Sequence, residues 1–206
     1  MWQWLAMITM TIDHIGYVFF PDDPLWRIVG RVAFPVYAYL LVEGYKHTRN
    51  VGRYMLRLLL LFAVSQLPYM ALFQTQELNV IGTLFLSVVV LWALDQPRLL
   101  VKVPLVAASA IVLALLDLDY GLYGLALVLS YRYIPTVWAA VVVHAVATFI
   151  WYRQVPVQYF SVPVTLLLLS EAAPKVRRAP AWLWRSFYPL HLTVLWLVHT
   201  WPLFTF

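Results

Sequence analysis

Long apolar runs, separated by short polar or proline-bearing breaks, make up most of this chain. A run of about 20 apolar residues is long enough to cross a bilayer as a helix. The runs cover residues 2–20, 25–45, 54–73, 79–95, 101–117, 119–134, 136–152, 157–171 and 182–203. The pattern predicts an all-α fold, a polytopic transmembrane helical bundle of about eight or nine spans in a single integral membrane domain, 1–206. The short run at 119–134 can also be re-entrant or half-buried.

The composition supports a membrane protein. Hydrophobic residues are 64% of the chain, charged residues only 11%, and the mean hydropathy is +0.80, whereas soluble domains carry about 25% charged residues. Cysteine is absent, which excludes disulfides, thiolate metal sites and an acyl-cysteine mechanism. The first run has no Lys or Arg before Arg27 and holds Asp13 and His14. We therefore expect a retained first helix rather than a cleaved signal peptide.

Basic residues predict the orientation, because Lys and Arg collect in cytoplasmic loops. The breaks after the second, fourth, sixth and eighth runs contain Lys46, Arg49, Arg53, Arg98, Lys102, Arg132, Lys175, Arg177 and Arg178, and Arg57 lies just beyond the first of these breaks. The alternate breaks hold only Arg27 and Arg153, together with the acids Asp22, Asp23, Glu77 and Asp119. This asymmetry predicts a cytoplasmic N-terminus.

Four ionisable residues lie well inside predicted spans, where a charge is costly and usually functional. Asp13 and His14 lie about 13 Å beyond Trp4, at about 1.5 Å per residue. Arg31 and His191 are expected at similar or somewhat shallower depth. One interpretation is a carboxylate that orients a histidine base, with Arg31 stabilising developing negative charge. The alternative is a salt bridge between Asp13 and Arg31 that holds the first two spans together.

A second polar group lies at the predicted cytoplasmic end of the second span. Glu43 and His47 are four residues apart and share a helix face with Tyr39. The cations Lys46, His47, Arg49, Arg53 and Arg57 could bind the phosphates of a nucleotide-like cofactor. Topology and contact with anionic lipids explain these cations better on the residues alone. His144 is expected to be a packing histidine and His199 an interfacial one, and no HExxH or comparable pattern indicates a metal site.

Several motifs resemble the TraX family in order and spacing. They are ITMTIDHIG at 8–16, RIVGRVAFPVYAYLLVEG at 27–44, HTRN at 47–50, RYMLRLLLLFAVSQLPY at 53–69, LNVIGTLF at 78–85, DYGLYG at 119–124 and FYPLHL at 187–192. The match covers the first 85 residues and the last two islands, while 95–117 and 135–185 fit only as hydrophobic spans. The positions that match are Asp13, His14, Gly30, Arg31, Phe34, Pro35, Glu43, Tyr120, Gly121 and His191.

The resemblance implies a bacterial inner-membrane acyltransferase that uses acetyl-CoA and is named for N-terminal acetylation of pilin. We then expect His14, Asp13, Arg31 and His191 to be catalytic, and Glu43, Tyr120 and Tyr188 to bind substrate. The cationic group at 46–57 would bind the acyl-CoA. The acceptor would carry an amine or a hydroxyl, lipids would surround the protein, and neither a metal nor nucleic acid is expected. Two alternatives stay open: a small transporter, although no inverted repeat is found, and a non-catalytic assembly partner.

Overall fold

The computed structural model describes residues 2–170 and 178–201. These residues form α1 (Trp2–Phe19), α2 (Pro24–Gly30), α3 (Ala33–His47), α4 (Val51–Phe73), α5 (Val80–Leu94), α6 (Leu99–Leu115), α7 (Gly121–Tyr133), α8 (Val137–Tyr152), the 3₁₀ helix η1 (Pro156–Ser161), α9 (Val162–Leu169) and α10 (Ala181–Thr200). The described part of the chain contains no strand, which confirms the all-helical class. Lys175 and Arg177, which entered the orientation argument, lie outside the described residues.

Over the residues that the structure describes, each predicted apolar run is helical, and two runs are divided. The run predicted at 25–45 consists of α2 and α3, which are separated by Arg31 and Val32. Pro35 has no N–H group, so the Arg31 carbonyl lacks its usual helical partner, which favours a break at this point. Asp23 caps the start of α2 by accepting a hydrogen bond from the Leu25 N–H. The run predicted at 157–171 is likewise divided between η1 and α9.

The outer surface of the bundle is strongly apolar. Leu67 of α4 is 77% exposed, and Leu100 of α6 is 90% exposed. Other large apolar side chains are exposed along α8 and α10. A surface of this kind is covered by lipid or by a partner in stable proteins. Together with the apolar helices, it supports a helical membrane protein.

By length and composition, two segments within the described residues are suited to cross a membrane. They are Pro24–His47, taken through the break at Arg31, and Val51–Phe73. The apolar helices Val80–Leu94, Leu99–Leu115, Val137–Tyr152 and Pro156–Leu169 are shorter. The number of spans and the side on which the N-terminus lies therefore stay predictions.

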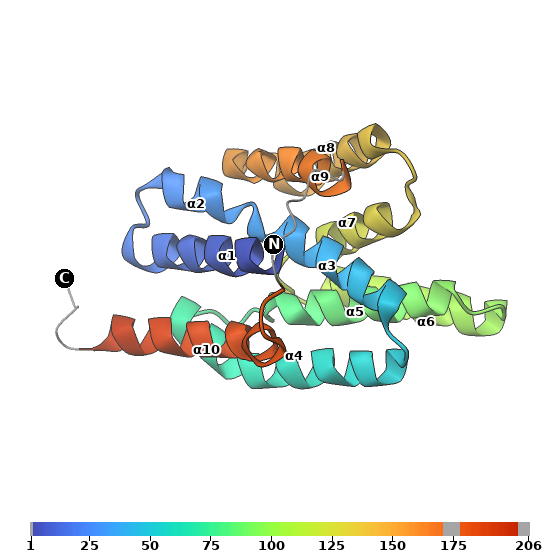
Figure 1. Ribbon diagram of the computed structural model, residues 1–206, viewed down its shortest axis with the longest axis horizontal. Coiled ribbons are helices and arrows are strands. Elements are labelled where there is room, and N and C mark those ends of the chain that lie inside the picture. Colours follow the sequence, from blue (N-terminus) through green and yellow to red (C-terminus); the bar gives the residue numbers. More distant parts are fainter. Residues whose placement is uncertain (1, 171–177, 202–206) are drawn as a thin grey trace.

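The helices pack in rough layers, with α1, α3 and α7 between the others (Figure 1). In this view α2, α8 and α9 lie above α1, α3 and α7, while α4, α5, α6 and α10 lie below. Helix α1 packs against α2, α3 and α10, and α3 packs against α7. The side chains of α1 thus meet residues from both ends of the chain.

A two-sided backbone contact joins the loop before α5 to the loop before α7. The Leu78 N–H donates to the Asp117 carbonyl at 2.8 Å, and the Asp119 N–H donates to the Leu78 carbonyl at 2.9 Å. Thr83 of α5 also donates its hydroxyl to the Asp119 carbonyl at 2.7 Å. These bonds hold Asp119 and Tyr120 at one end of the bundle, next to the ion cluster described below.

Candidate functional site

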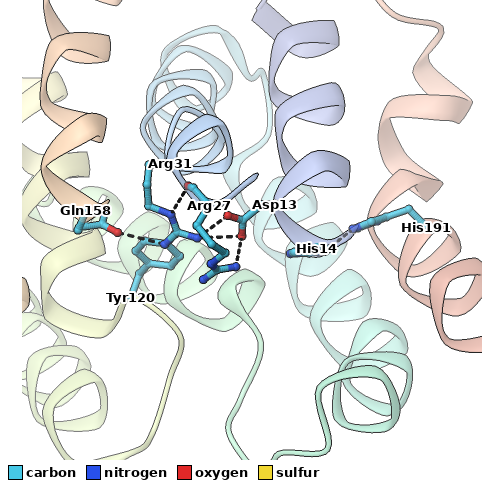
Figure 2. Close-up of polar contacts among 7 residues, drawn as sticks. All are labelled: Asp13, His14, Arg27, Arg31, Tyr120, Gln158 and His191. Atoms are coloured by element: carbon cyan, nitrogen blue, oxygen red, sulfur yellow. Dashed lines mark hydrogen bonds and ion pairs between the residues drawn. The ribbon is translucent and has the colours of Figure 1, made fainter. Parts of the chain in front are cut away.

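Asp13 lies at the centre of an ion cluster between α1 and α2 (Figure 2). Arg31 Nη2 contacts the two carboxylate oxygens of Asp13 at 2.6 and 2.8 Å, and Arg27 Nη1 contacts Oδ2 at 2.8 Å. Gly30 makes the approach of α2 possible, because a Cβ at this position would overlap the Asp13 side chain. The cluster therefore depends on a glycine next to one of its arginines.

Arg31 is buried and all of its donors are engaged. Besides Asp13, its Nη1 donates to the Tyr120 hydroxyl and to Gln158 Oε1, each at 3.1 Å, and its Nε donates to the Arg27 carbonyl at 3.3 Å. A guanidinium has five N–H donors, and each is engaged here. Arg31 would have to break a bond to stabilise a developing negative charge as we expected.

Arg27 is better placed to bind an added anion. Within the described part of the chain, its guanidinium group forms a single hydrogen bond, from Nη1 to Asp13. Its side chain is 27% exposed, compared with 8% for Arg31, and it lies over the Tyr17 ring at 5.0 Å. Two of its nitrogen atoms can therefore donate to a ligand.

The histidine next to Asp13 points away from it. Asp13 faces the arginines, whereas His14 faces α10, where His14 Nδ1 lies 2.9 Å from His191 Nε2 (Figure 2). The two imidazole rings are stacked, with centroids 5.0 Å apart. The expectation that Asp13 orients His14 is therefore wrong, and His191 is the group that holds the His14 ring.

The protons of this histidine pair are determined by a backbone carbonyl. His191 Nδ1 lies 2.8 Å from the Phe187 carbonyl, which can only accept, so Nδ1 must carry a proton. With both rings neutral, His191 Nε2 is then an acceptor, and His14 Nδ1 donates to it. The proton-free nitrogen of His14 is consequently Nε2, the tautomer that a general base requires.

A pocket of about 230 Å³ joins the ion cluster to the histidine pair. Asp13, His14, Arg27 and Arg31 line it, and it also contains Glu77 and Asp119 from the loops before α5 and α7. Within the described residues, the carboxylates of Glu77 and Asp119 form no hydrogen bond or ion pair. Withdrawal from water raises the pKa of Asp119 to about 7. Near neutral pH the pocket can therefore change its charge.

Tyr120 connects this pocket to the core through an unusual backbone conformation. Its φ angle is +66°, in the left-handed region that non-glycine residues rarely adopt and that often marks functional sites. This conformation places its hydroxyl at Arg31 and its ring in a stack on Phe34, with centroids 3.8 Å apart. Tyr120 also lines the pocket.

A second and larger cavity of about 870 Å³ lies between α3, α4 and α10. Of the predicted binding residues, Glu43, His47, Arg57 and Tyr188 line it. Arg178 and Arg185 also line it, although the sequence analysis had not assigned them to a site. The other predicted cations, Lys46, Arg49 and Arg53, are exposed and lie outside its lining. Lys46 pairs with Glu43 at 3.0 Å.

Two contacts of the ion cluster were not predicted. Arg27 lies one helical turn before Arg31, and this spacing could have indicated a shared face. Gln158 is fully buried. A buried amide within a predicted span was a weak signal, but the sequence held no sign that it reaches Arg31.

His144 forms a separate buried cluster with α7, η1 and α9. Its Nδ1 lies 2.6 Å from the Thr165 hydroxyl, and its Nε2 lies 2.8 Å from the Tyr123 hydroxyl and 3.0 Å from that of Ser161. The ring is fully buried and lines neither cavity. His144 is therefore a satisfied packing histidine.

Comparisons with known proteins identify a family. The model of the TraX protein family matches residues 1–199. The chain is 32% identical over 148 residues to a protein of Dichelobacter nodosus named "Probable fimbrial assembly protein FimC, serogroup H1", in a match that covers 63% of this chain and 60% of that protein. It is 51% identical over 35 residues to an uncharacterized protein of Rickettsia prowazekii (strain Madrid E), covering 17% and 14%. The chain thus spans less than two thirds of each of these curated relatives. No solved structure matches.

Proposed function

This chain belongs to the TraX family, and from that premise we propose that it is a multi-pass bacterial inner-membrane acyltransferase. The donor is acetyl-CoA, or another short acyl-CoA, bound from the cytoplasm. The acceptor is an amine that enters from the outer side of the membrane, such as the N-terminus of a pilin. One observation carries the proposal: a histidine pair whose proton-free nitrogen belongs to a residue that lines a polar pocket.

The larger cavity is the proposed donor site. Pockets for ligands of drug or cofactor size occupy about 300–1,000 Å³, so the cavity of about 870 Å³ is large enough and the pocket of about 230 Å³ is not. Arg57, Arg178 and Arg185 in its lining supply guanidinium groups, which suit phosphates. Lys46, His47, Arg49 and Arg53 add positive charge to the approach from the cytoplasm.

Tyr37 adds a contact for the arm of the donor. Its hydroxyl oxygen is buried and has no hydrogen-bond partner within the described residues, and the side chain lines the larger cavity. A buried hydroxyl without a partner is costly. A small turn of the Tyr37 ring towards the cavity would let an amide group of the pantetheine arm of a coenzyme A ester supply that partner.

The smaller pocket is the proposed acceptor site. The carboxylates of Glu77 and Asp119, which have no partner within the described residues, would pair with an ammonium group. This favours an amine over a hydroxyl. The name of the Dichelobacter relative concerns fimbrial assembly, and this supports a pilin-type acceptor.

The transfer follows from the proton arrangement. The amine enters as an ammonium and first loses a proton, which the ionised Asp119 can accept and return to water. The neutral amine nitrogen then attacks the thioester carbonyl carbon, while His14 Nε2 takes a second proton from it. Arg27 donates to the oxyanion that forms. The C–S bond breaks as the amide C–N bond is completed, and the proton on His14 passes to the departing thiolate, which leaves as free coenzyme A.

His191 acts through His14 in this scheme. Its Nε2 accepts the hydrogen bond from His14 Nδ1, so the ring keeps its orientation before and after it takes a proton. His191 is therefore a positioning residue.

The test is a transfer assay with protein purified into lipid nanodiscs. Radiolabelled acetyl-CoA is supplied with a lysine-free pilin-like peptide, or with the same peptide after its N-terminus has been blocked. We expect label only on the peptide with the free amine, and none with the His14→Ala protein. If no label reaches the peptide or any component of a membrane extract, the proposal is wrong.

A non-catalytic role in pilus assembly is the second candidate, and the name of the Dichelobacter relative favours it. Such a protein would not need a histidine base. It would support assembly equally well after His14→Ala and His191→Ala, whereas an acyltransferase whose product is needed for assembly would not.

A further inference from the structure

One side chain lies between the two cavities. Tyr188 of α10 lines both the pocket that contains His14 and the larger cavity on the α3 and α4 side. Within the described part of the chain, it is the only residue that the two linings share. It is 4% exposed, so it is packed between the cavities and does not extend into open solvent.

Tyr188 is also adjacent to the histidine pair. It precedes His191 by three residues on α10, and the two rings lie 5.5 Å apart. His191 in turn holds His14. An acyl group that moves from the larger cavity to His14 would therefore pass the Tyr188 ring just before it reaches the base.

We propose that Tyr188 is the partition between the donor cavity and the acceptor pocket, and that its ring sets the size of the acyl group that can reach His14. This inference rests on the proposed acyl transfer. The ring would turn aside for a short thioester end and exclude a longer chain. The small volume of the acceptor pocket, about 230 Å³, agrees with a short acyl group.

A series of Tyr188 substitutions tests the acyl selectivity. Acetyl-, butyryl- and hexanoyl-CoA are compared as donors with the same peptide acceptor. Tyr188→Ala should raise hexanoyl transfer relative to acetyl transfer by about tenfold, a ratio typical of pockets that discriminate by a few methylenes. Tyr188→Trp should lower acetyl transfer about tenfold by overfilling the passage, with unchanged KM for acetyl-CoA. Tyr188→Phe should keep the wild-type preference.

Leu190→Trp is the matched control. Leu190 lies on the same helix, is 52% exposed and lines neither cavity, so its substitution should leave the chain-length preference as in the wild type. If Tyr188→Ala and the wild type show the same chain-length preference, Tyr188 does not select the acyl group.

A labelling experiment tests the partition without any activity measurement. The natural sequence has no cysteine, so Met10→Cys introduces a single thiol into the smaller pocket. In proteoliposomes of one orientation, a membrane-impermeant thiol reagent is added on the side of the larger cavity. Adding Tyr188→Ala to the Met10→Cys protein should speed labelling from that side about tenfold through improved access to the thiol. Labelling from the opposite side should not change.

The two experiments separate the two proposals. If the wild-type protein transfers no acyl group, but the thiol of the Met10→Cys protein becomes reachable after Tyr188→Ala, the partition proposal stands and the acyltransferase proposal is wrong. If the wild-type protein transfers the acyl group, but the Met10→Cys protein is labelled at the same rate with and without Tyr188→Ala, the acyltransferase proposal stands and the partition proposal is wrong.

Discussion

His14 and His144 both lie in the interior of this bundle, and their surroundings differ in one decisive way. His144 uses both ring nitrogens, one with Thr165 and the other with Tyr123 and Ser161, and it lines neither cavity. His14 uses one nitrogen, with His191, and lines a polar pocket. Both ring nitrogens of His144 are therefore hydrogen-bonded, whereas Nε2 of His14 keeps a lone pair that a reactant can use.

The comparison shows that burial inside the bundle does not by itself mark a candidate catalytic histidine. Both rings are costly to withdraw from water and both have partners, as buried polar groups must. The difference lies in what remains unsatisfied. Around His14 there are a lone pair, two donor nitrogens of Arg27 and the carboxylates of Glu77 and Asp119, all at one pocket. We therefore expect substitutions to affect activity at the first histidine and stability at the second.

The largest expected effect is that of His14→Ala. Removing a general base typically lowers turnover by about 100- to 10,000-fold, and we expect a loss in this range in the nanodisc transfer assay. The melting midpoint should change little, because the ring is only half-buried. If the His14→Ala protein were nearly as active as the wild type, His14 would not be the base, and its free nitrogen would not distinguish it from His144.

His191 should have the next largest effect. Residues that orient a metal-binding histidine through its second ring nitrogen are commonly worth about 10- to 100-fold in activity. His191 orients His14 in the same way, so we expect His191→Ala to lower kcat by a similar factor with little change in the KM for acetyl-CoA. His191→Gln should recover much of the loss, since its side-chain oxygen can accept from His14 Nδ1. Equal losses in the two variants would indicate that His191 does not act by orienting His14.

Asp119→Asn should have a smaller effect that depends on pH. Burial raises the pKa of Asp119 to about 7, so the carboxyl is neutral well below pH 7 and negative above it. The wild-type KM for the amine should therefore fall as pH rises through 7. At pH 8 the variant should have a KM about fivefold higher, corresponding to about 1 kcal/mol for one ion pair.

At pH 6 the KM values of the wild type and Asp119→Asn should converge, since both side chains are then uncharged. The peptide amine, whose ordinary pKa is about 8, titrates identically in the two reactions, so comparing the two proteins at each pH controls for its own change of charge. A KM difference that stays the same across this pH range would mean that the carboxylate charge does not bind the acceptor.

The smallest effect on activity is expected for His144→Leu. This substitution leaves Thr165, Tyr123 and Ser161 without their shared partner, at a cost of about 2 kcal/mol. For a chain of this length, that corresponds to a melting midpoint roughly 4–8 °C lower. Transfer should fall by no more than about twofold, because His144 touches neither cavity and reaches Arg31 only through Tyr123 and Gln158. If His144→Leu lowered transfer activity as much as His14→Ala does, His144 could not be a purely structural histidine.

Part of the candidate site was predictable from single residues. Asp13, His14, Arg31 and His191 were identified because ionisable groups are rare inside apolar runs, and the structure places all four around α1. The salt bridge between Asp13 and Arg31, which was the alternative interpretation, is present, whereas the pairing of Asp13 with His14 was predicted wrongly. Neighbouring residues on a helix point about 100° apart, so Asp13 and His14 face different helices. That argument was available from the sequence and would have corrected the expectation.

Other contacts had no local signal. Gln158 reaches Arg31 across 127 residues of chain, and Arg178 and Arg185 join a cavity whose other walls come from α3 and α4. Basic residues near a span end look the same whether they line a cavity or face lipid headgroups. The contacts across helices distinguish the two cases.

The sequence alone determined that this chain forms apolar helices with short breaks, and which rare polar groups those helices contain. Hydrophobicity and proline act locally along the chain, so their consequences can be predicted residue by residue. Only the tertiary structure decided which nitrogen of His14 lacks a proton, that Arg31 is saturated while Arg27 is not, and that Tyr188 lies between two cavities. These properties depend on donors, acceptors and volumes from helices far apart in the chain, and only packing brings them together.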